Sequence, residues 1–157
     1  MALFGMKVRP LRNGRFRIDL DPDERGLLRT LPGQLRDLLA TDDPALERLF
    51  PPAYLDDPER AEEYRRLMRS DLLSSKLSSL DVLEATVDRT ELDEDELVAW
   101  MGALNDVRLV LGTRLDVSEG MDEDAFADDD PRRPAYALYG YLGYLQEWVV
   151  RALSTAL

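Results

Sequence analysis

Four aspartate–proline pairs limit what this chain can fold into more than any other feature. An aspartate side chain can accept hydrogen bonds from the free N–H groups at the start of a helix, and proline suits the first helical position. Each pair therefore predicts the start of a helix. The pairs are Asp21-Pro22, Asp43-Pro44, Asp57-Pro58 and Asp130-Pro131.

Capping signals and the spacing of apolar residues predict where the helices run. Asp21 with Glu24, and Asp93 with Glu96, have the spacing of a capping box. We expect Pro32-Gly33 to interrupt the first helix, since proline removes a helical hydrogen bond. The longest helix is expected to bend or break where its apolar face changes, in the segment "RSDLLSS". The expected helices cover residues 22–31, a second run to about 41, 44–50, 58–88, 94–115 and 134–157.

A β-hairpin is predicted before the first helix. Asn13-Gly14 is a strong turn signal, and Phe16, Ile18 and Leu20 alternate with charged residues after it. Such alternation gives a strand one apolar face, which can lie on a helical body. The predicted fold is therefore mainly α, a compact helical bundle of about five to six helices with a small N-terminal β-hairpin.

The length of 157 residues predicts one domain over residues 1–157. Seven acidic residues between Glu119 and Asp130 indicate a mobile loop. The expected parts of the domain are a hairpin (1–20), helices (21–117), the acidic mobile loop (118–133) and a C-terminal helix (134–157).

The segment "ALNDVRLVLGTRL", residues 103–115, places polar groups in a helix that is expected to be central to the bundle. A buried guanidinium needs an acidic or carbonyl partner, which for the arginines of this segment we expect from Glu147, Asp81 or Glu84. We interpret these polar groups as a structural network that determines how the helices meet. An anion- or ligand-binding site is the alternative. The network comprises Asn105, Asp106, Arg108, Arg114 and Glu147.

Small residues in the last two helices are expected to allow close helix packing. A glycine has no side chain, so another helix can approach it closely. Aromatic residues around these glycines in the last helix are expected to lie in the core or at a contact with a second copy. The glycines are Gly102, Gly112, Gly140 and Gly143.

The composition excludes several kinds of chemistry. There is no cysteine and no histidine, which removes thiolate chemistry and the commonest general base and zinc ligand. The net charge of −12 disfavours binding to nucleic acid or to anionic membranes. No segment has the roughly 18 apolar residues of a membrane span, and the first residues do not resemble a secretory signal. We expect a cytoplasmic protein without a cofactor.

Two alternative sites involve charged residues of the long helix. Glu59, Glu62 and Glu63 could hold Mg²⁺, as paired carboxylates do in all-helical hydrolases that act on nucleotides. Acidic residues are also favoured at a helix start by the helix dipole, and this is the preferred interpretation. Lys76 and Ser79 have the spacing of a catalytic dyad, but we assign the segment "SSKLSS" to the polar surface.

Two long helices and the opening helix carry a resemblance to a known family. The segments "WMGALNDVRLVLGTRLDV", "LGYLQEWVVRAL" and "LDPDERGLLRTLPGQLRDLL" resemble an uncharacterised actinobacterial family, domain of unknown function number two-thousand-seventeen. The resemblance spans nearly the whole chain and implies no catalytic residues. It implies a gene often encoded beside the adaptor of the Clp protease and near a metal-dependent peptidase.

The sequence therefore predicts a non-enzymatic interaction or regulatory protein, and the family's gene context suggests an accessory factor of regulated proteolysis. A protein partner is expected, and a homodimer is an open alternative. Two other functions are retained as hypotheses. One is a Mg²⁺-dependent hydrolase that uses the glutamates at the start of the long helix. The other is an acidic mimic of nucleic acid, which would use residues 119–130.

Overall fold

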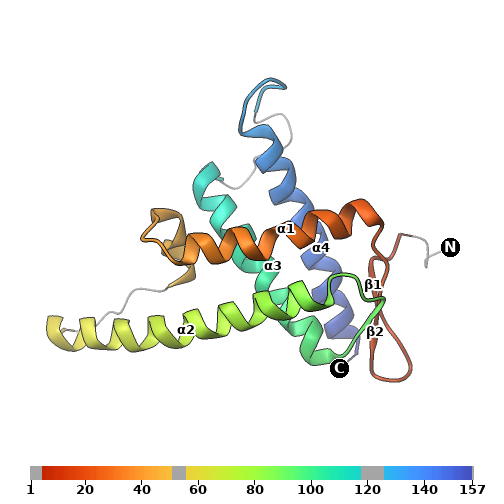
Figure 1. Cartoon of the computed structure of the whole chain (residues 1–157), viewed down its shortest axis with the longest axis horizontal. Helices are drawn as coiled ribbons and strands as arrows, with labels where there is room; N and C mark the ends of the chain where they lie inside the picture. The colour runs from red at the N-terminus through yellow and green to blue at the C-terminus, as the bar shows by residue number, and fades with distance from the viewer. Residues whose placement is uncertain (1–4, 51–55, 118–125, 157) are drawn as a thin grey trace.

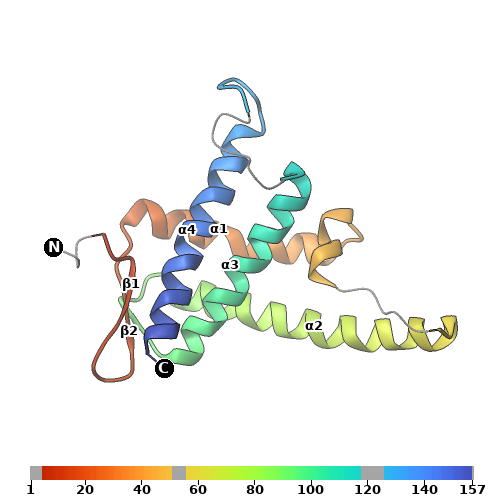
Figure 2. The ribbon, with the colours of Figure 1, turned by 180° about the vertical axis from the view of Figure 1, so that it is seen from behind.

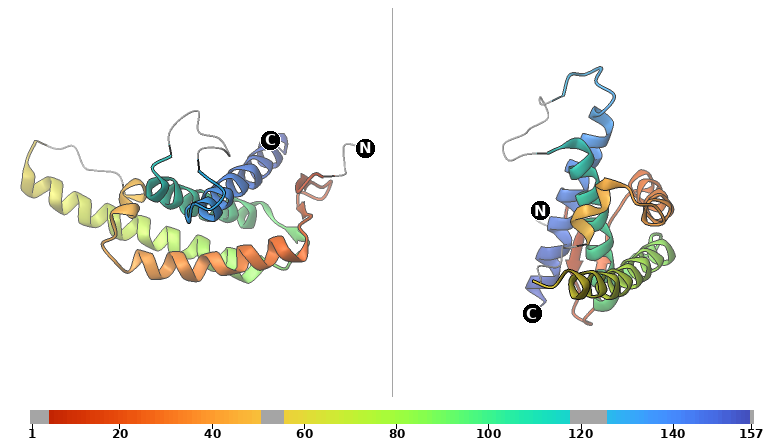
Figure 3. Two further views of the ribbon diagram at one scale, coloured as in Figure 1. Left: turned by 90° about the horizontal axis from the view of Figure 1, so that it is seen from above. Right: turned by 90° about the vertical axis from the view of Figure 1, so that its left-hand side faces the viewer.

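The computed structural model describes residues 5–50, 56–117 and 126–156. The chain is mainly α-helical, as predicted, with a small antiparallel sheet beside the helices (Figures 1 and 2). Viewed from the side, α1 and α2 form one layer, α3 lies in the middle and α4 covers its other face (Figure 3). The elements are β1 (Val8–Pro10), β2 (Phe16–Ile18), α1 (Pro22–Leu39), the 3₁₀ helix η1 (Pro44–Leu49), α2 (Pro58–Thr86), β3 (Glu91–Leu92), α3 (Glu94–Leu115) and α4 (Arg133–Thr155).

The predicted hairpin is confirmed, and a third strand adds to it. Val8 lies opposite Ile18 in the β1–β2 pair, and Gly14 in the turn has a φ of 81°, a conformation that glycine adopts without strain. Strand β3, which the sequence did not predict, pairs with the other edge of β2 so that Phe16 lies opposite Leu92. The sheet order is thus β1-β2-β3.

The prediction of an interruption at Pro32-Gly33 is wrong, because α1 continues through both residues. Proline inside a helix costs about 3 kcal/mol. Leu28, Leu31 and Leu35 lie on one side of α1 and are at most 4% exposed. Burying each such side chain contributes about 1.5–3 kcal/mol, so the packing of this face outweighs the cost of the proline.

Three of the four aspartate–proline pairs begin helices as predicted, and both capping boxes are present. The exception is Asp130-Pro131, since α4 begins at Arg133 and has no side-chain cap. Asp130 instead accepts hydrogen bonds from the backbone and guanidinium groups of Arg132, and these hold the pKa of Asp130 at about 2. Asp130 therefore stabilises the turn at residues 131–132, and α4 begins after this turn.

The expected bend or break of the long helix is also wrong. Helix α2 runs without interruption for 29 residues, and its first half extends beyond the other helices (Figures 1 and 3). Its second half packs on α1 and α3, through Leu80 and Leu83 among others. The change of apolar face near residue 72 marks the point where the helix leaves the body, not a break.

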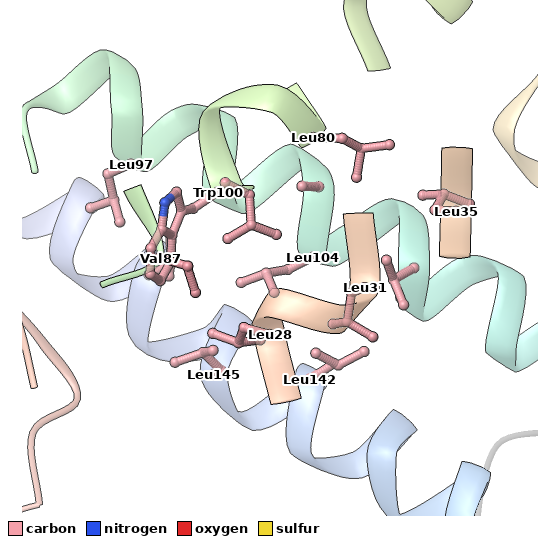
Figure 4. Close-up of a cluster of buried hydrophobic side chains, with 14 of the residues drawn as sticks. Leu28, Leu31, Leu35, Leu80, Val87, Leu97, Trp100, Leu104, Leu142 and Leu145 are labelled. Atoms are coloured by element: carbon pink, nitrogen blue, oxygen red, sulfur yellow. The ribbon is translucent and has the colours of Figure 1, made fainter. Parts of the chain in front are cut away.

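The core lies where α1, α2, α3 and α4 meet. Figure 4 shows Trp100 in a cluster that includes leucines from these helices, with Val87 beside its ring. The Trp100 indole N–H donates to the Thr86 hydroxyl at 2.7 Å, so this large ring is buried without an unpaired polar group. The figure labels Leu28, Leu31, Leu35, Leu80, Val87, Leu97, Trp100, Leu104, Leu142 and Leu145, all at most 4% exposed.

A hydrogen-bonded cluster around Glu24 ties the hairpin to α1 and α4. The Glu24 carboxylate accepts from Lys7 Nζ at 2.8 Å and from the Tyr141 hydroxyl at 2.7 Å, and it also accepts from the Asp21 amide. Burial acts to raise the pKa of Glu24, but these hydrogen bonds together hold the pKa below its ordinary value. Burial and the nearby carboxylate raise the pKa of Tyr141.

Replacing Tyr141 with phenylalanine is expected to lower the free energy of unfolding by about 1.5 kcal/mol at pH 7, because one hydrogen bond to a charged group is lost. The stabilisation that Glu24 contributes is present above the unfolded-state pKa, near 4.5, and is lost as the pH falls through its lowered folded-state pKa. The deficit of the variant should therefore shrink in acid. Urea unfolding at several pH values measures it, with Tyr144→Phe on an exposed side chain as the control.

Candidate functional site

Asp106 in the middle of α3 forms a buried ion pair with a residue of α2. The Lys76 ammonium donates to Asp106 Oδ1 at 3.0 Å, and the exposed fractions of the two side chains are 16% and 8%. Burial raises the pKa of Asp106, although the charge and hydrogen bond of Lys76 act in the opposite direction. Lys76 was assigned to the polar surface from its sequence, but it lies on the face of α2 that packs on α3.

Arg108 does not have the acidic partner that was expected. Its guanidinium lies over the Tyr139 ring, with the Cζ atom 4.7 Å from the ring centroid, and its buried Nε atom has no hydrogen-bond partner. The three carboxylates considered as partners are used elsewhere. Asp81 and Glu84 bind Arg36, while Glu147 accepts from Arg151 at 2.6 Å.

Asn105 joins α3 to α4 close to Arg108. The Asn105 amide oxygen accepts from Gln146 Nε2 at 3.3 Å, while Gln146 Oε1 is buried without a partner. The residues grouped in the sequence therefore separate in space. Asp106 faces α2, Asn105 and Arg108 face α4, Arg114 faces η1, and Glu147 is exposed on α4.

The glycines of α3 and α4 accommodate side chains from neighbouring helices. A Cβ atom on Gly143 would lie 3.1 Å from Arg108 Nε, and one on Gly112 would lie 3.2 Å from the Tyr139 ring. The two glycines thus leave room for the stacked Arg108–Tyr139 pair. Gly102 has ordinary contact with Ser79, whereas a Cβ atom on Gly140 would meet nothing within 4 Å.

An apolar groove between α1, α3 and α4 is the clearest candidate for a binding site. It encloses about 320 Å³, and we call it the α1–α3 groove. A concave apolar surface with a few polar groups at its rim is the usual form of a ligand- or partner-binding site. The apolar lining residues are Leu31, Leu35, Leu38, Val107, Val110, Leu111 and Leu138, and the polar ones are Gln34, Asp37, Thr41 and Arg114.

Arg114 is the residue from the sequence-predicted set that reaches this groove. Its guanidinium donates to Asp43 Oδ2 at 3.2 Å, and the exposed fraction of its side chain is 51%. Asp43 also caps η1, so one carboxylate fixes the start of η1 and holds the arginine at the rim. An exposed ion pair of this kind contributes little to stability, which leaves the guanidinium available to a partner.

A larger hollow of about 690 Å³ lies beside η1. Its lining contains both acidic and basic side chains, among them Asp42, Glu47, Arg48 and Arg69. Arg69 lies over the Phe50 ring, 4.1 Å from its centroid. Because its charged groups would have to lose water to bind an apolar segment, this hollow is a weaker candidate than the α1–α3 groove.

The proposed magnesium ligands do not converge on a site. Glu59, Glu62 and Glu63 are all exposed in the first turns of α2. In the described ranges, no group of three acidic side chains is arranged to hold a metal ion. Residues 119–125 of the acidic segment, on which the nucleic-acid mimic hypothesis depends, lie outside the described residues.

The α1–α3 groove was missed at the level of sequence. Its α1 side comes from Leu31, which precedes Pro32, and from Leu35 and Leu38, which follow it, so the groove spans the position where an interruption of the helix was expected. A continuous helix would have placed these leucines opposite Val107 and Val110 on α3. Leu31, Leu35 and Leu38 are separated by four and three residues, which is the spacing of one face of a continuous helix. This spacing predicts the α1 side of the groove, whereas Pro32 favours an interruption.

Comparison with known proteins identifies relatives over nearly the whole chain. The model of a family described as "Domain of unknown function (DUF2017)" matches residues 6–153. The chain is also similar to proteins of Mycobacterium bovis and Mycobacterium tuberculosis that are both named "Oxidative stress regulator AosR". Each is 28% identical over 180 residues, which cover 88% of this chain and 82% of the relative. No solved structure matches.

Proposed function

Because this chain belongs to the DUF2017 family and is similar to proteins named as oxidative stress regulators, we propose that it is a non-enzymatic regulatory protein. It acts by binding an apolar segment of a protein partner in the α1–α3 groove. The observation that carries this proposal is the groove itself, an apolar surface between α1, α3 and α4 that is bordered by polar side chains.

The shape and chemistry of the groove suit a short apolar segment of a protein. Leu38 and Leu111 are only partly buried, so apolar surface remains accessible between the helices. Asp37 and Arg114 at the rim carry opposite charges and can orient the polar backbone or flanking charges of a bound segment.

Within the part of the chain that the structure describes, none of the helices has an apolar stretch that could span a lipid bilayer.

The absence of cysteine from this chain limits how it takes part in a response to oxidants. Thiol oxidation is the usual chemical basis of a protein redox sensor. Since this chain has no thiol, the proposed role does not depend on thiol oxidation of this chain and is exerted through the partner that it binds.

Capture of partners with groove variants tests the proposal. Gln34 is exposed at the rim of the groove, so Gln34→Trp should cover the apolar surface without disturbing the core. Val98 on α3 is 45% exposed and does not line the groove, so Val98→Trp is the matched control. Quantitative mass spectrometry of tagged protein from peroxide-treated cells should show partners retained by the wild type and Val98→Trp and lost in Gln34→Trp.

Equal recovery of every partner by all three proteins would rule out the groove as the binding site. The identity of the captured protein also separates two kinds of regulation. A transcription factor would favour control of gene expression. A component of the Clp protease would favour the accessory role in proteolysis that the gene context of the family suggests.

A further inference from the structure

The first half of α2, residues 58–72, projects from the body of the molecule, and we call it the arm (Figures 1 and 3). It exposes three large apolar side chains, with exposed fractions of 49% for Tyr64, 64% for Leu67 and 39% for Met68. Single exposed apolar residues are common, but a cluster on a projecting helix indicates a contact surface. The question is what this surface contacts.

Four exposed residues form one continuous line along the arm. Arg60, Tyr64, Leu67 and Asp71 are separated by four, three and four residues, which is the spacing of a coiled-coil seam. At about 100° per residue, this line lies on the side of α2 opposite to Leu80, which packs in the core. The fold of the chain therefore leaves the seam uncovered.

Two copies of the seam are complementary if they lie antiparallel. From its N-terminal end, the seam consists of a cation, an aromatic residue, an aliphatic residue and an anion. If a second copy lies antiparallel, Arg60 of one arm meets Asp71 of the other, and Tyr64 meets Leu67. The same contacts occur twice about a two-fold axis between the apolar layers, as in an isologous interface. A parallel arrangement would instead place Arg60 against Arg60 and Asp71 against Asp71.

We propose that two copies of this chain associate through an antiparallel pair of arms, with Arg60, Tyr64, Leu67 and Asp71 at the contact. Among the described residues, neither Arg60 nor Asp71 forms an ion pair within its own chain, so both charges are available to the second copy. Met68 flanks the seam and adds apolar area. This inference goes beyond the proposed function, because the α1–α3 groove does not include the arm.

The small size of this contact predicts a weak dimer. The seam spans about 17 Å of helix, which is short compared with the interfaces of permanent dimers. Sedimentation velocity of the full chain should therefore show a mass that rises toward that of a dimer as the protein concentration increases through the micromolar range. Leu67→Glu should weaken the association at least about tenfold, because it places a charge in the apolar layer. Val98→Glu on an exposed position of α3 is the control.

Reversing the two charges separately tests the antiparallel geometry. In Arg60→Asp, acidic residues would oppose each other at both ends of the seam, and in Asp71→Arg basic residues would do so. Each variant alone should therefore be monomeric at concentrations where the wild type associates. An equimolar mixture of the two should form a heterodimer, and the double variant Arg60→Asp/Asp71→Arg should associate about as well as the wild type.

Several results would overturn the proposal. These are a wild-type chain that stays monomeric at all concentrations, a dimer that persists in Leu67→Glu, or a double variant that does not recover association. Circular dichroism of each variant establishes that the arm remains helical. Failure of this dimer would leave the groove proposal intact, since Gln34→Trp tests the groove in an experiment that does not depend on association.

Discussion

Lys76→Met is expected to lower the free energy of unfolding by about 3–5 kcal/mol at pH 7, because it leaves the buried Asp106 carboxylate without its counter-ion. The two side chains are largely buried, and their N–O distance is 3.0 Å. Methionine preserves most of the volume of the lysine stem, so the loss reports on the charge rather than on packing. Urea unfolding followed by circular dichroism gives the size of the change.

The double variant Lys76→Met/Asp106→Leu should recover most of this loss. Removing both charges also removes the energy needed to take them out of water, and an apolar pair of similar volume is often as stable as the ion pair. If the double variant were as unstable as Lys76→Met, packing around the lysine stem, and not the unpaired carboxylate, would explain the loss.

The pH dependence of Lys76→Met gives an independent check. Burial already raises the pKa of Asp106 above its ordinary value of 3.8, so the contribution of this group to stability is greatest at low pH and is lost as the pH rises through its folded-state pKa. Without Lys76 that pKa rises further. The deficit of Lys76→Met relative to the wild type should therefore shrink as the pH falls from 7 toward the raised pKa of Asp106.

Trp100→Ala is expected to lower the free energy of unfolding by about 3–5 kcal/mol, since it removes a fully buried ring from the meeting point of the helices. Thr86→Val keeps the ring but removes the hydroxyl that accepts the indole N–H. It should cost about 1–3 kcal/mol, because the buried donor is left unpaired. Chemical denaturation of both variants measures these values, and a loss below 1 kcal/mol for Trp100→Ala would contradict the central position of the ring.

The sequence was most informative where one local signal determines the structure. Asp93 with Glu96 forms the predicted capping box, and α3 spans the predicted residues 94–115. The hairpin follows in the same way from Asn13-Gly14 and the alternation after it. In these places the side chains that decide the conformation are within a few residues of each other.

Prediction failed where distant contacts outweigh a local preference. Pro32 favours a break, but the buried leucines of α1 keep the helix continuous. Strand β3 has two residues and exists because the β2 edge is beside it. The partner of Asp106 could not be identified because Lys76 lies 30 residues away, in a segment that reads as polar surface. The candidate groove depends on the same long-range packing, so it could not be predicted from any single motif.

Survival of cells after exposure to hydrogen peroxide tests the central claim most directly. A strain that lacks this gene would be complemented with the wild type, with Gln34→Trp or with Val98→Trp, each verified to be folded and equally abundant. The proposed function predicts that the wild type and Val98→Trp restore survival and that Gln34→Trp does not. Full restoration by Gln34→Trp would contradict a regulatory role exerted through the α1–α3 groove.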